Sequence, residues 1–222
     1  MKNLKSLTAI ILANLILTGY VFADNNVNSV TSNINYEVTS NNTTLSMKCL
    51  VSGLFFNVFN SEQITVELWS YNSSAPVFSG QISQLNPAIG QLESIDLGNI
   101  SGNYYIVFKY ENALPTWSRL PVNFFSGMNV NYDFTSAASQ AYNSNQILLN
   151  ASPLLYGGCS GDVNQDGIID ATDLMYISND VENYLPLSGY PTDLNANGII
   201  AGNDLILADE NAIEFRIVEK PW

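Results

Sequence analysis

The chain contains no histidine among its 222 residues. Histidine is the usual base for a serine or cysteine nucleophile and a frequent zinc ligand, so its absence excludes those centres. Basic residues are also few, because seven Lys and Arg stand against twenty Asp and Glu, for a net charge of −13. Such a surface repels nucleic acid and anionic membranes, and it indicates a protein that handles cations.

Cysteine is scarce as well, with only Cys49 and Cys159 present. In an exported protein, one long-range disulfide between them is the natural interpretation. The alternative is two separate buried thiols.

Residues 1–23 have the pattern of a secretory signal peptide. Lys2 and Lys5 precede an apolar run over residues 7–17, and Ala23 is a small residue suited to cleavage before Asp24. The run is short for a bilayer span, so a membrane anchor is the weaker interpretation. We therefore expect a secreted or cell-surface protein with no membrane span in the mature chain.

Short strand-like segments dominate the first part of the chain after a polar lead-in over residues 24–44. Segments such as "QITVELWSY" (63–71) and "GNYYIVFKYEN" (102–112) alternate apolar and polar residues and are separated by Gly, Asn and Pro. Ile64, Val66 and Leu68 should face the core, whereas Thr65, Glu67 and Trp69 should face outward. Residues 45–135 are therefore predicted to form an antiparallel β-sandwich domain. The 136–158 linker that follows contains a further predicted strand at residues 146–150.

The order of these strands, with Gly102–Val107 as "GNYYIV", resembles the transthyretin-like, carboxypeptidase-regulatory type of β-sandwich. That resemblance covers residues 45–134 and implies a non-catalytic spacer or binding module.

A calcium-loop pattern begins at Gly161 with "GDVNQDGIIDATDL". Counting Asp162 as position 1, oxygen-bearing side chains fall at positions 1, 3, 5, 9 and 12. A glycine stands at position 6 for the sharp turn, and a backbone carbonyl is available at position 7. This is the ligand spacing of an EF-hand-type loop, and the predicted calcium ligands are Asp162, Asn164, Asp166, Ile168, Asp170 and Asp173.

The pattern returns 31 residues later as "TDLNANGIIAGNDL". Here the predicted ligands are Asp193, Asn195, Asn197, Ile199 and Asp204, with Ala201 in place of the position-9 ligand. Four carboxylates in the first loop become two in the second, so the first of the two Ca²⁺ sites should be the stronger. A structural turn that holds little metal is the alternative for the second loop.

Each loop is followed by an amphipathic segment that predicts a helix. Residues 173–184 place Ile177 on an apolar stripe, and residues 204–215 place Ala208 and Phe215 on another. The two helices should pack face to face. Ile169, at position 8, should pair with its counterpart in the other loop.

This duplicated loop–helix unit resembles the type I dockerin family over about residues 159–215, and the predicted dockerin-like domain spans residues 159–222. The resemblance implies a calcium-dependent module that binds a cohesin-like partner and uses the ligands named above. The predicted fold is thus mainly β with a small α part near the C-terminus, a β-sandwich followed by a dockerin-like pair of calcium loop–helix units.

Catalysis is not expected from the remaining acidic residues, which are scattered and form no local motif. They are Glu62, Glu67, Glu93, Asp96, Glu111 and Asp133. Aromatic residues of the strands could form a flat platform for sugars, although core packing is the more common role. They are Trp69, Tyr71, Tyr104, Tyr105, Tyr110 and Trp117.

Three functions remain open. The first is a non-catalytic calcium-binding module for protein assembly or adhesion at the cell surface, through a cohesin-like or other surface protein. The second is a calcium-dependent self-assembling subunit whose partners are its own copies. The third is a component of a polysaccharide-processing system, with a polysaccharide as the ligand.

Overall fold

The computed structural model describes residues 42–55, 63–86, 88–183 and 190–222. The predicted signal peptide, most of the lead-in and Glu62 lie outside the described residues. Residues Ser40–Trp222 form one compact unit. Within the part that is described, no helix is long and apolar enough to cross a membrane.

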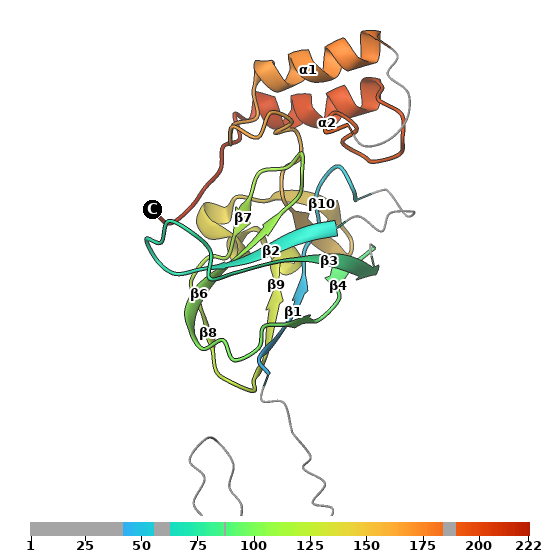
Figure 1. The fold of residues 1–222 in the computed structure, drawn as a ribbon. Helices are drawn as coiled ribbons and strands as arrows, with labels where there is room; N and C mark the ends of the chain where they lie inside the picture. The colour runs from blue at the N-terminus through green and yellow to red at the C-terminus, as the bar shows by residue number, and fades with distance from the viewer. Residues whose placement is uncertain (1–41, 56–62, 87, 184–189) are drawn as a thin grey trace, which may run out of the picture. The chain divides into compact units, whose positions relative to one another are not determined.

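The chain is mainly β, as expected, with two helices near the C-terminus (Figure 1). Nine strands form one hydrogen-bonded network with the path β5-β1-β4-β3-β2-β6-β7, to which β8 adds beside β6 and β9 beside β1. Their bounds are β1 Thr44–Lys48, β2 Gln63–Trp69, β3 Phe78–Asn86, β4 Gln91–Leu92, β5 Ile95–Asp96, β6 Gly102–Lys109, β7 Thr116–Trp117, β8 Val122–Phe124 and β9 Asn129–Asp133.

The network curls around one apolar core. Strand β2 contributes Ile64, Val66 and Leu68, which are fully buried, so the predicted core face is confirmed, but Glu67 on the other face is also buried rather than exposed, at 8%. Residues of β1, β6, β8 and β9 join the same cluster, including Leu45 and Phe108. Because β1 and β2 both face this cluster, the strands form two layers in the manner of a β-sandwich, with β2 and β6 crossing β1 and β9 (Figure 1).

Most pairs are antiparallel, but β1 and β9 run parallel from Thr44↔Asn129 to Lys48↔Asp133. After β9, three short 3-10 turns lead to a separate hairpin. This hairpin consists of β10 Ile147–Ala151 and β11 Leu154–Gly157, so the strand predicted at residues 146–150 is confirmed.

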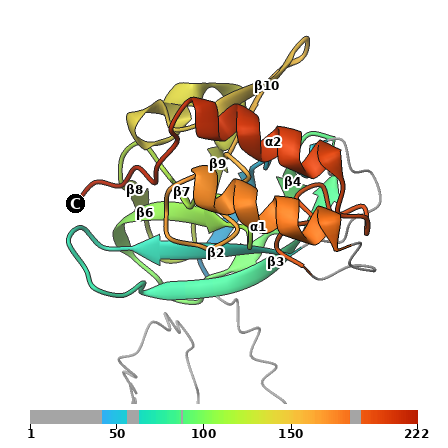
Figure 2. The same cartoon turned by 90° about the horizontal axis from the view of Figure 1, so that it is seen from above.

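Helices α1 Ala171–Glu182 and α2 Gly202–Ile213 follow the two loops and lie side by side (Figure 2). Ile177 and Ala208 are buried between them together with Leu194, as the stripes predicted. The prediction for Phe215 is wrong, because α2 ends at Ile213 and Phe215 has a left-handed backbone and a side chain that is 67% exposed.

The two cysteines are free thiols, so the disulfide interpretation is wrong and the alternative holds. Cys49 belongs to the core of the sandwich, whereas Cys159 packs with Leu114 and Ile169 in a separate cluster. Burial raises the pKa of both thiols, to about 11 for Cys159. Each therefore serves as a small apolar residue.

Candidate metal centre

The first loop is shaped by its own side-chain oxygens, which accept hydrogen bonds from its backbone. Asp162 accepts from the N–H of Gly167 at 3.2 Å, Asn164 from the N–H of Asp166 at 2.8 Å, and Asp166 from the N–H of Ile168 at 2.9 Å. Gly167 has a φ of +86°, which suits glycine at the turn. Three of the predicted ligand side chains thus hold the turn of the loop through hydrogen bonds to its backbone.

The start of α1 closes this loop. Asp170 is the N-cap of the helix and accepts from the N–H of Thr172 at 2.7 Å. Asp173 is fully buried, and its two oxygens accept from the N–H groups of Val163 at 2.9 Å and Asp170 at 3.0 Å. Asp173, at position 12, therefore connects the start of α1 to the beginning of the loop, and the capping box fixes Asp170, at position 9, beside it.

The second loop repeats this framework around Asp193. Asp193 accepts from the N–H of Gly198 at 2.8 Å, and Asn197 accepts from the N–H of Ile199 at 2.8 Å. Asp204 accepts from the N–H of Ala201 at 2.9 Å and from that of Asn195 at 3.3 Å. The framework is the same, but Ala201 gives α2 no side-chain cap.

Four of the loop carboxylates are buried without a basic partner. The ion pairs among the described residues are Lys48–Asp133 and Lys109–Glu67, and neither involves a loop. The relevant carboxylates are Asp162, Asp173, Asp193 and Asp204, each at most 6% exposed. Buried carboxylates are normally paired with a cation, so each loop provides a site that a positive ion would stabilise.

Two of these carboxylates, Asp162 and Asp204, have raised pKa values because their charged forms are buried. Burial raises the pKa of Asp162 to about 6, and the nearby charges of Asp173 and Asp166 add to the rise, while the Gly167 N–H opposes it. Burial also raises the pKa of Asp204, with Asp193 adding to the effect. A cation in either loop would reverse these shifts.

The donor types suit calcium better than a softer metal. In the described part of the chain, no three carboxylate or thiol side chains gather closely enough to hold an ion by themselves. A centre here would also need the Asn164, Asn195 and Asn197 side chains and the carbonyls of Ile168 and Ile199. A mixed set of carboxylate, amide and carbonyl oxygens is what calcium takes.

The pairing predicted for Ile169 is wrong, and residues 216–218 take that place. The Ile169 N–H donates to the carbonyl of Arg216 at 2.9 Å, and the Val218 N–H donates to the carbonyl of Gly167 at 2.8 Å. An antiparallel bridge joins Ile168 to Ile217. The first loop therefore pairs with the segment after α2 and not with the second loop, and this segment does not carry the calcium-loop pattern.

Both loops are hydrogen-bonded to the sandwich by buried polar groups that carry no motif. For the second loop, the Asn112 side chain donates to the carbonyl of Asp193 at 3.4 Å. The carbonyl of Asn112 accepts from the N–H of Gly161 at 2.7 Å. Ser52 and Ser160 bond reciprocally with backbone N–H groups, and Asn211 of α2 donates to the carbonyl of Ser160 at 2.8 Å. Sequence reasoning missed these residues, because buried Ser and Asn are recognisable only once their partners are known.

Three of the scattered acids in the described part of the chain have hydrogen-bond or ion-pair partners of their own. Glu67 is bound by Lys109 and Trp69, and Asp96 accepts from Asn42. Asp133 caps a 3-10 turn. Glu111 is an exposed residue of the turn that follows β6. Their positions are explained by hydrogen bonding and solvation.

An apolar groove runs along the exposed side of the helix pair. It has a volume of about 430 Å³. Met175 and Ile206 are 65% and 60% exposed beside it. Its lining consists of three pairs, each separated by the 31-residue repeat: Leu174 and Leu205, Met175 and Ile206, and Ser178 and Asp209.

Comparisons with known proteins identify a fold likeness only. No protein-family model matches the chain, and no curated protein matches its sequence. The chain is similar to one from a crystal structure of a C-terminal interface mutant of the type II cohesin–X–dockerin complex from Acetivibrio cellulolyticus. The TM-score is 0.51 at 16% identity, covering 79% of this chain and 97% of that one. An N-terminal interface mutant from the same organism gives a TM-score of 0.48 at the same identity and coverage.

These findings correct the resemblances inferred from the sequence. The type I dockerin assignment of residues 159–222 is wrong, because no family model matches there and the fold likeness, to a type II complex, spans 79% of the chain. The transthyretin-like assignment of the strands is wrong for the same reasons. The physical cause is that loop spacing and strand alternation determine local geometry, which many different folds share.

Proposed function

We propose that this chain is an exported, non-catalytic calcium-binding module that assembles with another protein at the cell surface. The observation that carries the proposal is the repeated framework of the two loops, each built around buried carboxylates that lack a basic partner. The twofold occurrence of the same bonding pattern argues for a shared ligand.

The metal's role in this proposal is structural. Without a cation, burial disfavours the charged form of Asp162 and the nearby Asp173 carboxylate adds repulsion, and both effects raise the pKa of Asp162. An ion held by these oxygens would remove that repulsion, so its binding energy would stabilise the loop–helix units. No chemistry on a substrate is required of it.

Assembly is proposed to use the groove between the helices. Met175 and Ile206 would supply an apolar centre, and Asp209 would lie at its margin. Contacts of this kind, apolar inside and polar outside, are typical of protein interfaces. The fold likeness to a chain of a cohesin–X–dockerin complex adds support from analogy alone.

Self-assembly is the second candidate, and the paired lining of the groove favours it. Residues related by the 31-residue repeat line both sides of the groove, so its two halves are alike. Such a surface is suited to a self-complementary twofold contact.

The experiment that tests the proposal places a charge in the groove. The partner is first captured from the surface proteins of the source organism and purified, and it is then titrated with the chain in calcium. Met175→Asp should abolish this binding. Asn179→Asp, an exposed change of the same kind on α1, should bind as the natural chain does. Equal affinity of Met175→Asp and the natural chain would refute the groove as the interface.

Light scattering on the purified chain separates the two candidates. A monomer with and without calcium supports a different protein as the partner. A calcium-dependent dimer that Met175→Asp dissolves would instead establish self-assembly.

A further inference from the structure

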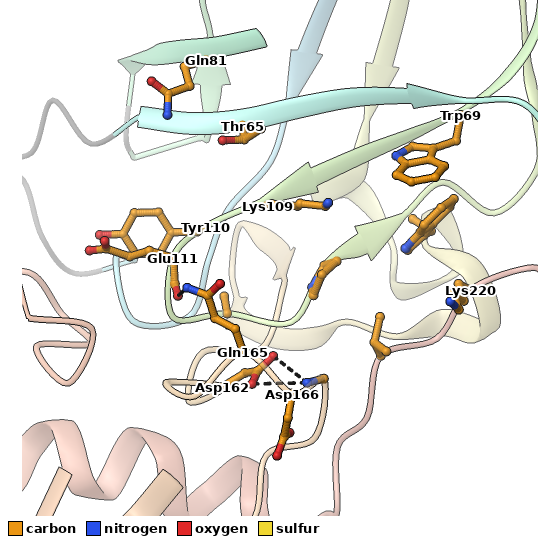
Figure 3. A pocket seen from close by; sticks show the side chains of 15 residues that line it. Thr65, Trp69, Gln81, Lys109, Tyr110, Glu111, Asp162, Gln165, Asp166 and Lys220 are labelled. Carbon is orange, nitrogen blue, oxygen red and sulfur yellow. Dashed lines mark hydrogen bonds between the residues drawn. The ribbon is translucent and has the colours of Figure 1, made fainter. Parts of the chain in front are cut away.

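A second, larger cleft lies between the sandwich and the first loop. It has a volume of about 810 Å³, within the range of small-molecule sites. Figure 3 shows Thr65, Lys109 and Trp69 on one side, from β2 and β6, and Gln165 and Asp166 of the first loop on the other. The cleft is separate from the groove on the helices, with which it shares no lining residue.

One wall of the cleft is an aromatic surface held in a fixed orientation. The indole N–H of Trp69 donates to Glu67 at 2.7 Å, and Lys109 binds the same carboxylate at 2.8 Å. Trp117 packs against Trp69 with ring centroids 5.5 Å apart. Trp69 is partly buried, with the ammonium group of Lys109 5.8 Å from its ring centroid, and the part of the ring that stays exposed could contact a ligand ring with little loss of side-chain freedom.

The other surfaces of the cleft are polar and bear charges of both signs. Gln81 is exposed on β3, and Gln165 is positioned by its hydrogen bond to the carbonyl of Glu111 at 3.0 Å. Lys109 is paired with Glu67, and Lys220 and Glu111 bring opposite charges to the lining of the cleft. These walls offer both donors and acceptors, and their balanced charge gives no advantage to a strongly charged ligand.

We propose that this cleft binds an oligosaccharide. A sugar ring has an apolar face that can lie on Trp69, and its hydroxyls can both donate to and accept from Thr65, Gln81 and Gln165. A purely apolar ligand would leave these polar groups unpaired, at a cost in free energy. Nucleic acid would be repelled by the net charge of −13.

The test is native gel electrophoresis with one soluble, uncharged polysaccharide in each gel: xyloglucan, arabinoxylan or galactomannan. With calcium present, at least one of them should retard the natural chain. Trp69→Ala should reduce the affinity at least about tenfold, as expected for a central aromatic contact. Gln81→Ala, at an exposed strand position, should weaken it severalfold.

Phe125→Ala removes an aromatic side chain that is 57% exposed outside the cleft and should leave retardation unchanged. If Trp69→Ala lowers the melting temperature so far that the protein unfolds, Gln81→Ala decides the question. The proposal is overturned if no polysaccharide retards the natural chain, or if the folded cleft variants bind as it does. Such a result would refute the oligosaccharide site only, because the calcium proposal is tested by a separate binding measurement.

Discussion

The two loops have the same backbone framework but differ in charge and surroundings. Loop one carries Asp at positions 5 and 9, pairs with residues 216–218 and borders the large cleft. Loop two carries Asn and Ala at those positions, and Ile199 next to them is 63% exposed. The comparison shows that the loop shape is maintained by a few shared acceptors, whereas the negative charge of the loop differs at residues that vary without changing that shape.

The largest expected effect is that of removing calcium altogether. In excess chelator, amides of α1 and α2 should exchange with deuterium at rates near those of an unfolded chain, because the buried carboxylates lose their counter-ion. Amides of β2 and β6 should remain protected by the sandwich core. Hydrogen-exchange mass spectrometry measures both, and unchanged protection of the helices would contradict a folding role for the metal.

Removing one predicted ligand from each loop should show which loop contributes more to calcium binding and stability. Asp162→Ala should lower the affinity of its site by about tenfold or more and reduce thermal stability in calcium, since loop one supplies more charge. Asp193→Ala should have a smaller effect on stability. Melting curves at saturating calcium compare the two, with Asp209→Ala as an exposed control. Equal losses of stability in the two variants, or a larger loss in Asp193→Ala, would contradict the prediction that the first site is the stronger.

Restoring the missing position-9 ligand of the second loop should narrow the difference in calcium affinity between the two loops. Ala201→Asp adds a carboxylate at position 9 and an N-cap for α2, which is worth about 1 kcal/mol for a helix. Calcium affinity of the second site should rise, and α2 should become more stable even in chelator. Calcium titration and thermal melting test these two effects, and no gain in either would show that Ala201 is not the deficiency.

The pH dependence of the metal-free protein should reveal the buried acids. The folded pKa of Asp162, about 6, is above the ordinary 3.8, so the folded state holds its proton more tightly. Stability without metal should therefore fall as the pH rises from about 4 to about 6. With calcium the trend should reverse, because the ion requires the charged form. Melting temperatures across this range, with and without calcium, test the sign.

The smallest expected effect compares the two loop glycines. Gly167 and Gly198 both have positive φ, and an added Cβ costs about 1 kcal/mol in such a conformation. At Gly167 the new atom would also lie 3.1 Å from Val218, whereas at Gly198 nothing lies within 4 Å. Gly167→Ala should therefore destabilise more than Gly198→Ala. Equal unfolding free energies would show that the contact with residues 216–218 is unimportant.

Local features of this chain were predictable, and distant pairings were not. The alternation of Ile64, Val66 and Leu68 predicted a buried strand face because a strand has a period of two residues. The loop spacing likewise predicted that a helix follows each loop, although α1 and α2 begin at Ala171 and Gly202, earlier than the expected residues 173 and 204. The pairing of Ile169 with the segment after α2 depends on how the chain returns to the sandwich, which no local pattern records.

The separation of Cys49 and Cys159 is a similar case. Two cysteines in an exported chain suggest a disulfide, but only the packing shows that each belongs to a different cluster. The short strands β7 Thr116–Trp117 and β8 Val122–Phe124 were also missed, because two or three residues are too few to show a period.

The most direct test of the central claim is isothermal titration of calcium into the full mature chain after the metal has been stripped from it. Two binding events are expected, with the tighter one lost in Asp162→Ala and the weaker one lost in Asp193→Ala. Absence of heat on calcium addition, in protein shown to be folded by its melting curve, would contradict the account.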